Sequence, residues 1–153
     1  MPDLKSIQAR FGVEFSDLSL LQRALTHRSY LNEHPELTLE DNERLEFLGD
    51  AVLDFIAGSL LYNRFPEMDE GQLTRLRAGL VRTETLADFA RELRLGDALL
   101  LGRGEDESGG RKRQKNLCGA FEAMIGAIYL DQGMESAQHV AEPLFAPALD
   151  EIL

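Results

Sequence analysis

The sequence predicts an all-α protein organised as one domain. Apolar residues recur every three or four positions along several segments, while the strict alternation of apolar and polar residues that is typical of half-buried strands is absent. The chain has 153 residues and 44% of them are hydrophobic, which is enough to bury a sizeable core without disulfides. A helical domain with no sheet is therefore the expected architecture.

The first amphipathic segment covers residues 18–31 and follows two suitable N-cap residues, Ser16 and Asp17. A second segment, residues 42–54, reads NERLEFLGDAVLD and also has the spacing of a helix. This second helix carries acidic residues in an otherwise apolar stretch, and these acids make it a candidate functional site.

Three carboxylates of residues 42–54 share one side of the expected helix. At about 100° per residue, with Glu43 as zero, Glu46 falls near −60° and Asp50 near −20°. The opposite side, assigned to the core, consists of Leu45, Leu48, Val52, Phe55 and Ile56. Three like charges within two turns repel one another, and a divalent cation such as Mg²⁺, which prefers hard oxygen ligands, would relieve that repulsion. A solvated acidic face is the alternative explanation.

Phe47 lies on the acidic side of the same helix, near 40°, beside the small residues Ala51 and Gly58. A large aromatic ring between small residues, turned away from the core, is typical of a side chain that inserts into another surface. This pattern predicts that the face is also an interface. The alternative is that another part of the same chain covers Phe47.

Two more helices are expected in the middle of the chain, over residues 69–81 and residues 83–95. Thr83 is the expected N-cap of the second of these helices, and Gly96 is its expected stop.

The second half of the chain is predicted to hold a loop and two helices. Residues 102–115, rich in glycine and charge, read as a loop, and residues 116–133 form the most apolar helix. The closing segment contains Pro143 and Pro147, which predict a helix break or a new first turn there.

Glu122 stands alone as a carboxylate in the apolar helix, with Gly119, Ala123 and Gly126 on its own side. Small residues allow a second helix to approach closely, and a carboxylate in such a contact needs a cation or a donor. Glu122 therefore either joins Glu46 and Asp50 in a metal site or pairs with an arginine.

Composition restricts the class of protein. The single cysteine, Cys118, forms no internal bridge and is interpreted as a small core residue, which fits a reducing compartment. No signal peptide or long apolar run is evident. We therefore expect a cytoplasmic protein. The net charge of −11 has the wrong sign for an ordinary nucleic-acid binder. Basic residues do concentrate in one place, either a local positive edge or a solvated loop: Arg111, Lys112, Arg113 and Lys115.

Taken together, these blocks resemble the ribonuclease III family. The block NERLEFLGDAVLD is the most diagnostic, and five others agree in order along nearly all of the chain: ALTHRSY (24–30), EGQLTRLRAGLV (70–81), TETL (83–86), LGRGEDESGG (101–110) and FEAMIGAIYLDQG (121–133). The resemblance implies a homodimeric, all-helical endonuclease domain over residues 1–153 that cleaves double-stranded RNA in ribosomal and other RNA processing. It further implies Mg²⁺ as cofactor, with Mn²⁺ able to substitute, and products with 5′-phosphate and 3′-hydroxyl ends and short 3′ overhangs. The double-stranded-RNA-binding domain that usually follows is not expected within these residues.

The resemblance also implies roles for individual residues. Glu46, Asp50 and Glu122 match metal-binding catalytic acids, Glu43 matches a further catalytic acid, and Glu70 matches an acid that lines the cleavage valley. Phe47 matches the hydrophobic knob of the dimer interface. Six residues are candidate substrate contacts, each with a structural role as an equally simple explanation: His27, Ser29, Thr83, Arg111, Arg113 and Lys115.

One position departs from the family pattern. Where the family has aspartate, three residues before Glu122, this chain has Gly119. Two readings follow: an enzyme with a weakened metal site, or a non-catalytic RNA-binding or assembly dimer. We favour the enzyme, because Glu43, Glu46, Asp50 and Glu122 are all present.

Overall fold

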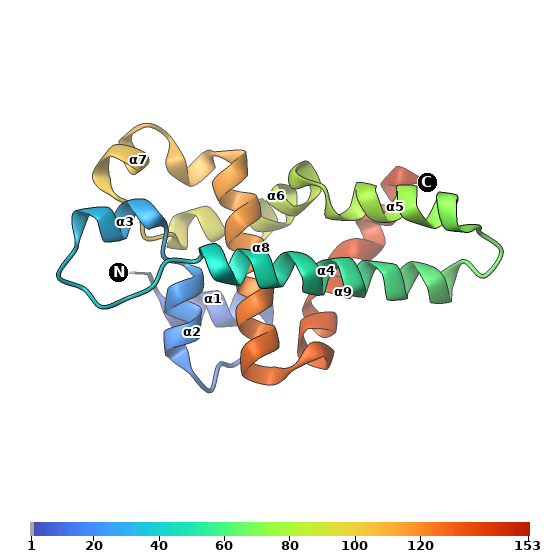
Figure 1. Ribbon diagram of the computed structural model, residues 1–153, viewed down its shortest axis with the longest axis horizontal. Helices are drawn as coiled ribbons and strands as arrows, with labels where there is room; N and C mark the ends of the chain where they lie inside the picture. Colours follow the sequence, from blue (N-terminus) through green and yellow to red (C-terminus); the bar gives the residue numbers. More distant parts are fainter. Residues whose placement is uncertain (1) are drawn as a thin grey trace.

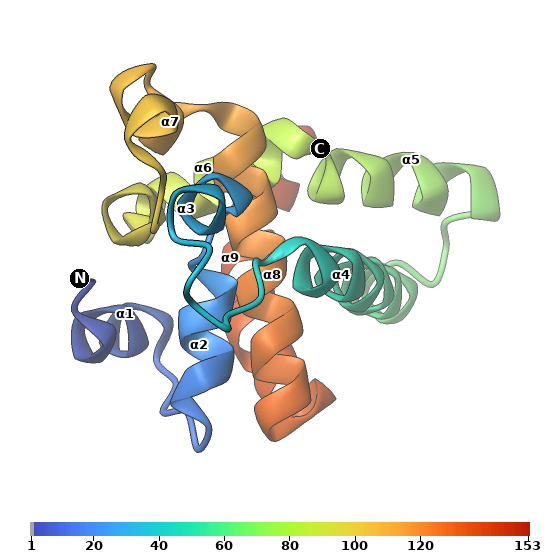
Figure 2. The same ribbon diagram turned by 60° about the vertical axis from the view of Figure 1, so that its left-hand side comes forward.

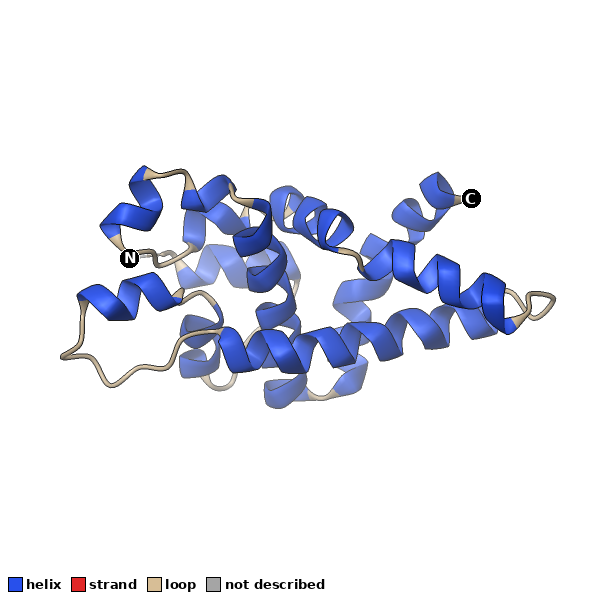
Figure 3. Cartoon of the chain, turned by 45° about the horizontal axis from the view of Figure 1, so that its top comes forward, coloured by secondary structure: helices blue, strands red, loops and turns tan. Residues whose placement is uncertain are grey.

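A computed structural model describes residues 2–153 of the chain and shows a bundle of helices (Figures 1 and 3). The predicted all-α class is confirmed, because no strand occurs in these residues and the only extended pairing is an isolated bridge between Thr26 and Leu100. The elements are α1 (Leu4–Phe11), α2 (Leu18–Ala24), α3 (Arg28–Glu33), α4 (Glu43–Arg64), α5 (Glu70–Val81), α6 (Thr83–Glu92), η1 (Leu95–Ala98), α7 (Arg103–Glu107), η2 (Gly110–Lys112), α8 (Gln114–Gln132) and α9 (Met134–Ile152).

The long helices α4 and α8 cross at the centre of the molecule (Figures 1 and 2). Their backbones meet at two buried glycines, Gly49 and Gly126, and a Cβ on either one would lie 3.1 Å from the backbone nitrogen of the other. Because no side chain separates the helices there, the residues one turn to each side are brought against the opposite helix. This crossing positions the acidic residues of α4.

The core surrounds α8, which is buried along most of its length. Phe89 of α6 packs edge-on against Phe121 of α8 at 5.5 Å and against Phe145 of α9 at 5.8 Å between ring centroids. Aromatic pairs in this geometry add to the stabilisation from area burial. Side chains of α6, α8 and α9 thus pack together in this part of the core.

Two predicted helix starts are confirmed by their caps. The Asp17 carboxylate accepts from the Ser19 backbone N–H at 2.9 Å, and Asp69 forms a capping box with Gln72 at the start of α5. Thr83 was expected to cap α6 but is its first helical residue, after Arg82, so that prediction is wrong.

The continuous helix predicted over residues 18–31 is also wrong, because the chain breaks between α2 and α3. There the Leu100 N–H donates to the Leu25 carbonyl at 2.8 Å and the His27 N–H donates to the Leu100 carbonyl at 3.0 Å. A distant segment therefore takes the hydrogen bonds that a helix would have used, and periodicity within residues 18–31 cannot reveal that.

Three further expectations need correction. The predicted loop at 102–115 contains α7 and η2, and α9 continues through both prolines instead of breaking. Phe55, assigned to the core, is 58% exposed, whereas Leu45, Val52 and Ile56 are buried as expected. No helix in the described part of the chain is long and apolar enough to span a membrane.

Candidate functional site

The crossing of α4 and α8 brings Asp50 and Glu122 together. Gly49 lies directly against the backbone carbonyl of Glu122, so the neighbouring Asp50 side chain reaches the Glu122 carboxyl and forms a hydrogen bond with it. The two acids are contributed by different helices, and the glycine between the helices sets their separation. The packing required for the predicted metal site, with these two faces together, is present.

Crowding changes the acidity of Glu122. Burial, the hydrogen bond to Asp50, and the charges of Asp50 and Glu46 raise the pKa of Glu122 to about 8. The Cys118 thiol lies one helical turn away, donates to Glu122 Oε1 at 3.7 Å, and has its pKa raised to about 12 by burial and by Glu122. Near neutral pH this end of the site therefore holds a protonated carboxyl and a thiol that is inert as a nucleophile.

Glu46 occupies a separate place in the same region. Its half-buried carboxylate lies over Gly119 of α8, where a Cβ would be 2.7 Å from its Cδ atom. Burial and the charge of Glu43 raise the pKa of Glu46, while the ammonium group of Lys115 opposes that shift. Glu46 is therefore the α4 acid that contacts position 119, where the family resemblance implies an aspartate.

The three acids do not form one pre-assembled ligand cluster. Within residues 2–153 no group of three or more His, Cys, Asp or Glu side chains is arranged to hold a metal ion. Asp50 pairs with Glu122, whereas Glu46 contacts Gly119. The donor set still fits a hard divalent cation, because all three donors are carboxylates and like-charge crowding raises the pKa of Glu122.

A charged cavity of about 370 Å³ opens beside Glu46. Acidic and basic side chains both face it, and Arg28 pairs with Glu43 across one edge at 3.0 Å. Its lining comes from α3, α4, α7 and α8 and their connections: His27, Arg28, Asn42, Glu43, Glu46, Glu105, Arg113, Lys115 and Asn116. The cavity is thus lined by two of the predicted acids, Glu43 and Glu46, and by Arg113 and Lys115 of the predicted basic cluster.

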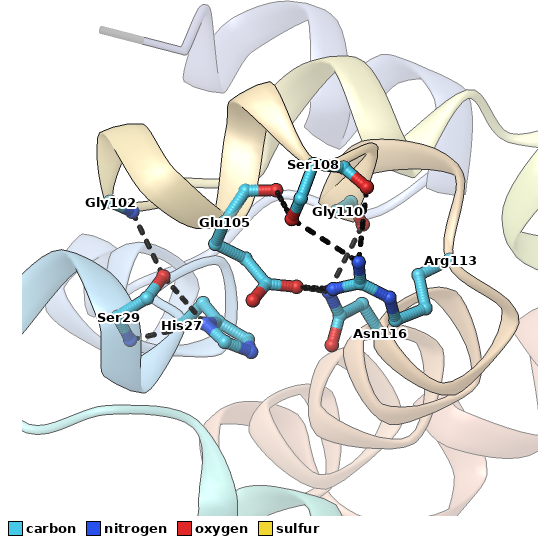
Figure 4. Close-up of polar contacts among 8 residues, drawn as sticks. All are labelled: His27, Ser29, Gly102, Glu105, Ser108, Gly110, Arg113 and Asn116. Atoms are coloured by element: carbon cyan, nitrogen blue, oxygen red, sulfur yellow. Dashed lines mark hydrogen bonds and ion pairs between the residues drawn. The ribbon is translucent and has the colours of Figure 1, made fainter.

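Within this cavity wall, Arg113 serves the protein's own structure (Figure 4). Its guanidinium forms an ion pair with Glu105 and donates to the Ser108 carbonyl at 3.1 Å, and Asn116 donates to the same Glu105 carboxylate at 2.8 Å. Arg113 therefore fastens α7 to the start of α8.

His27 and Ser29 also have structural partners (Figure 4). The Ser29 N–H donates to His27 Nδ1 at 3.1 Å, which caps α3, and the Gly102 N–H donates to Ser29 Oγ at 2.9 Å. The pair joins α3 to the segment before α7, so RNA contact through these residues stays a prediction without added support.

Arg111 and Lys115 differ in how far their charged groups are bound by other parts of the protein. The Arg111 guanidinium donates to the carbonyls of Gly96 at 3.0 Å and Leu99 at 2.7 Å and forms an ion pair with Asp106. Lys115 is exposed at the cavity, and no ion pair involves it among the described residues. Of the predicted basic contacts, Lys115 is the one available to a phosphate.

Glu70 and Thr83 are among the predicted site residues that do not line the cavity beside Glu46. Glu70 begins α5 at the far end of α4 from Glu43 (Figure 1), since α5 runs back along α4, and it lines a different cavity with Tyr62 and Arg77. The structure does not bring Glu70 to Glu46, Asp50 and Glu122 within this chain. Thr83 is exposed at the start of α6, and its hydroxyl contacts the Cys118 thiol.

Sequence reasoning missed four residues of the cavity: Arg28, Asn42, Glu105 and Asn116. Arg28, Asn42 and Glu105 lie in blocks that carried the family resemblance, and Asn116 was predicted to begin the apolar helix, which instead begins at Gln114. No signal within one segment could have found them, because the cavity forms only when α3 and α7 pack together.

Comparisons with known proteins point to one family. Residues 17–149 match the family model described as Ribonuclease-III-like. Curated proteins named Ribonuclease 3 are similar to this chain. The protein of Enterococcus faecalis is 51% identical over 144 residues, which cover 94% of this chain and 63% of that protein. The protein of Roseiflexus is 52% identical over 145 residues, which cover 94% of this chain and 61% of that protein. The chain thus spans less than two thirds of the length of these relatives.

Solved structures agree with the sequence relatives. A nuclease domain of ribonuclease III from Campylobacter jejuni, described as flexible in the region involved in dimer formation, superposes with a TM-score of 0.88 at 40% identity, covering 95% of this chain and 98% of that one. Dicer from Pichia stipitis superposes with a TM-score of 0.66 at 31% identity, covering 90% of this chain and 58% of that one.

Proposed function

The chain belongs to the ribonuclease III family, and from this premise we propose that it is a Mg²⁺-dependent endonuclease of double-stranded RNA. The observation that carries the proposal is that one helix crossing places Asp50 against Glu122 and Glu46 over the adjacent turn of α8, at Gly119. The relatives named Ribonuclease 3 support the same activity.

The chemistry divides between the chain and the ion. Bound Mg²⁺ supplies an activated water and neutralises charge on the phosphate, and Mn²⁺ fits the same oxygen donors. Glu46, Asp50 and Glu122 would hold the ion, and Glu122 would have to be ionised to serve as a ligand, since only the carboxylate form binds a metal. Glu43, which forms an ion pair with Arg28, lies at the cavity edge and adds negative charge near the proposed metal ligands. Products would carry 5′-phosphate and 3′-hydroxyl ends.

Lys115 is the proposed contact to the RNA backbone. It faces the cavity beside Glu46, and a single ammonium near the acids can hold a phosphate without reading a base. An A-form duplex is recognised mainly by its shape, its 2′-hydroxyls and its phosphates. The overall charge of −11 predicts weak binding with strong dependence on salt.

A homodimer is the proposed assembly, with Phe47 at its interface. Phe47 is 81% exposed, and Phe55 and Tyr62 extend the exposed aromatic surface along α4. Exposed rings of this size mark contact surfaces. Two sites in one dimer would cut both strands of a duplex and leave short 3′ overhangs. Cytoplasmic RNA processing, including that of ribosomal precursors, fits this activity and the free, buried Cys118.

The test is cleavage of a long RNA duplex by the purified protein with Mg²⁺ at low salt, with single-stranded RNA of the same sequence as control. We expect cleavage of the duplex alone, and loss of at least about a hundredfold in rate for Glu122→Gln. An inactive protein, or a Glu122→Gln variant as fast as the parent, contradicts the proposal.

A second candidate is a non-catalytic RNA-binding dimer, favoured by glycine at position 119 and by acids that are not pre-assembled. It predicts retention of duplex RNA in a gel-shift assay with no turnover at any Mg²⁺ concentration.

A further inference from the structure

We propose that a basic pocket at the C-terminal end of α6 binds phosphate groups of the RNA backbone, at a place separate from the cavity beside Glu46. Arg94 and Lys112 are the residues that contact these phosphates. The inference rests on the proposed function, because it takes duplex RNA as the ligand. It adds a second point of attachment to the one proposed for Lys115.

Positive charge is concentrated in this pocket, although the chain as a whole is acidic. The pocket has a volume of about 340 Å³, and four of the chain's 16 lysines and arginines line it, against a single acid, Asp97. The four basic residues are Arg91, Arg94, Arg111 and Lys112. Because the net charge of the chain is −11, a local excess of cations marks a place where an anion can bind.

Two of these cations already have partners within the protein. Arg91 forms an ion pair with Asp88 at 2.6 Å, and Arg111 forms one with Asp106 at 3.0 Å. Their charges are therefore balanced internally. The capacity of the pocket for an external anion depends on the other two basic side chains.

Arg94 and Lys112 are exposed, and neither takes part in an ion pair within residues 2–153. The exposed carboxylate of Asp97 opposes them on the pocket wall. Two cations against one carboxylate leave a net positive charge. A phosphodiester group, which carries one negative charge, neutralises it.

Local folding gives no reason for an arginine at position 94. Across the described part of the chain, Arg94 is the only residue other than glycine with a positive φ, 53°, and it stands just past the end of α6, where glycine is common. Arg10 of α1 fastens this turn, because its guanidinium donates to the Arg94 carbonyl at 2.9 Å and to the Leu93 carbonyl at 3.3 Å. Both contacts are to the backbone, so glycine would serve the turn better, and the charge of the arginine explains its presence.

The pocket lies next to the proposed cleavage cavity. The two share no lining residue, but both are lined by the segment 111–117, which leads from η2 into α8. Arg113 and Lys115 line the cavity, whereas Arg111 and Lys112 line the pocket. A duplex presents phosphates along both of its strands, so one RNA molecule can supply ligands to Lys115 and to the pocket.

The test is binding of a long RNA duplex in EDTA, measured by fluorescence anisotropy at several salt concentrations. Arg94→Gly and Lys112→Gln should each weaken binding about fivefold and lower the salt dependence by about one counterion. Arg94→Lys keeps the charge and should bind like the parent.

Lys5→Gln is the matched control for the loss of one positive charge. Lys5 is an exposed lysine of α1 that lines a different cavity and has no ion pair among the described residues. This variant should bind RNA like the parent. If Arg94→Gly and Lys112→Gln bind as tightly as Lys5→Gln, the inference is overturned.

Thermal melting separates binding from a structural role of Arg94. Arg94→Gly should melt close to the parent, because glycine adopts a left-handed turn without strain and Arg10 still reaches the same carbonyls. If this variant melts early, Lys112→Gln decides the question alone, since that substitution changes no backbone requirement.

Inorganic phosphate tests the other source of the same chemistry. Calorimetry that shows saturable binding of inorganic phosphate by the parent and none by Arg94→Gly, while the two bind duplex equally, would overturn the assignment to RNA.

Cleavage assays distinguish this inference from the proposed function. Arg94→Gly should raise KM for the duplex about fivefold, with a smaller effect on kcat. A parent whose duplex binding depends on Arg94 but which never cleaves contradicts the proposed function alone. A parent that cleaves duplex while both pocket variants bind it normally contradicts only this inference.

Discussion

Gly49 of α4 and Gly126 of α8 lie against each other with no side chain between them, and a Cβ on either would come within 3.1 Å of the other's backbone nitrogen. Because Glu46 and Asp50 flank Gly49, the same contact that packs the core also sets the spacing of the candidate site. Stability and the geometry of the candidate site are therefore coupled through one helix crossing.

Gly126→Ala should destabilise the protein strongly, although alanine favours helices by about 1 kcal/mol over glycine. The new Cβ would lie 2.5 Å from the Leu45 carbonyl oxygen, so the backbones must separate. We expect a loss of about 3 kcal/mol in the free energy of unfolding, measured by urea denaturation. Gly104→Ala, with an open Cβ position, should be neutral or slightly stabilising; equal stability of the two variants would contradict the crossing.

The metal-free protein should lose stability as the pH rises from about 5 to about 8. The pKa of Glu122 is about 8 in the folded protein against an ordinary 4.5, so across this window the folded state holds a proton that the unfolded state has released. The slope of stability against pH is therefore negative, and we expect a loss of about 1 to 2 kcal/mol after screening.

Glu122→Gln is the control for this pH dependence, because an amide of the same shape does not titrate. The variant should have a flatter profile and exceed the parent in stability at pH 8. Added Mg²⁺ should raise the melting temperature of the parent at pH 8 and leave the variant unchanged. A parent whose stability rises between pH 5 and 8 would refute the assignment of Glu122.

Substitutions at Arg111 and Lys115 should affect different properties, the first the stability of the protein and the second its binding of RNA. Arg111→Ala removes donors to the carbonyls of Gly96 and Leu99, and we expect a loss of about 2 kcal/mol in unfolding free energy. Lys115→Ala should leave stability unchanged, weaken binding of duplex RNA without added metal, and reduce the salt dependence by about one counterion. Calorimetry and filter binding at several salt concentrations distinguish these outcomes, and the reverse pattern would contradict both assignments.

Phe47→Asp should convert the proposed dimer into a monomer. Burying a charge in an apolar contact is costly, so the dissociation constant should rise by more than about thirtyfold in sedimentation experiments. Leu18→Asp, at an exposed leucine of α2, serves as the control and should leave the assembly unchanged. A Phe47→Asp variant that sediments like the parent would remove Phe47 from the interface.

Much of the fold was predictable because its signals are local. Asp17 and Asp69 begin helices through side chains that bond to the next turn, and Leu45, Val52 and Ile56 are buried where periodicity put them. The predictions that failed depend on contacts, present or missing, between segments that are far apart in the sequence. The segment around Leu100 ends the predicted helix at 18–31, and Phe55 is exposed because no other element covers that side of α4.

The sequence by itself determined the helical class, the family, and the acids that share one face of α4. It could not determine which acids meet, because Asp50 and Glu122 lie far apart in the chain and their contact depends on two glycines that let α4 and α8 touch. The tertiary structure alone decided that Arg111 and Arg113 are occupied internally while Lys115 is not. It also decided that the carboxylate over Gly119 comes from Glu46, since only packing brings one helix's side chain into the space left by another.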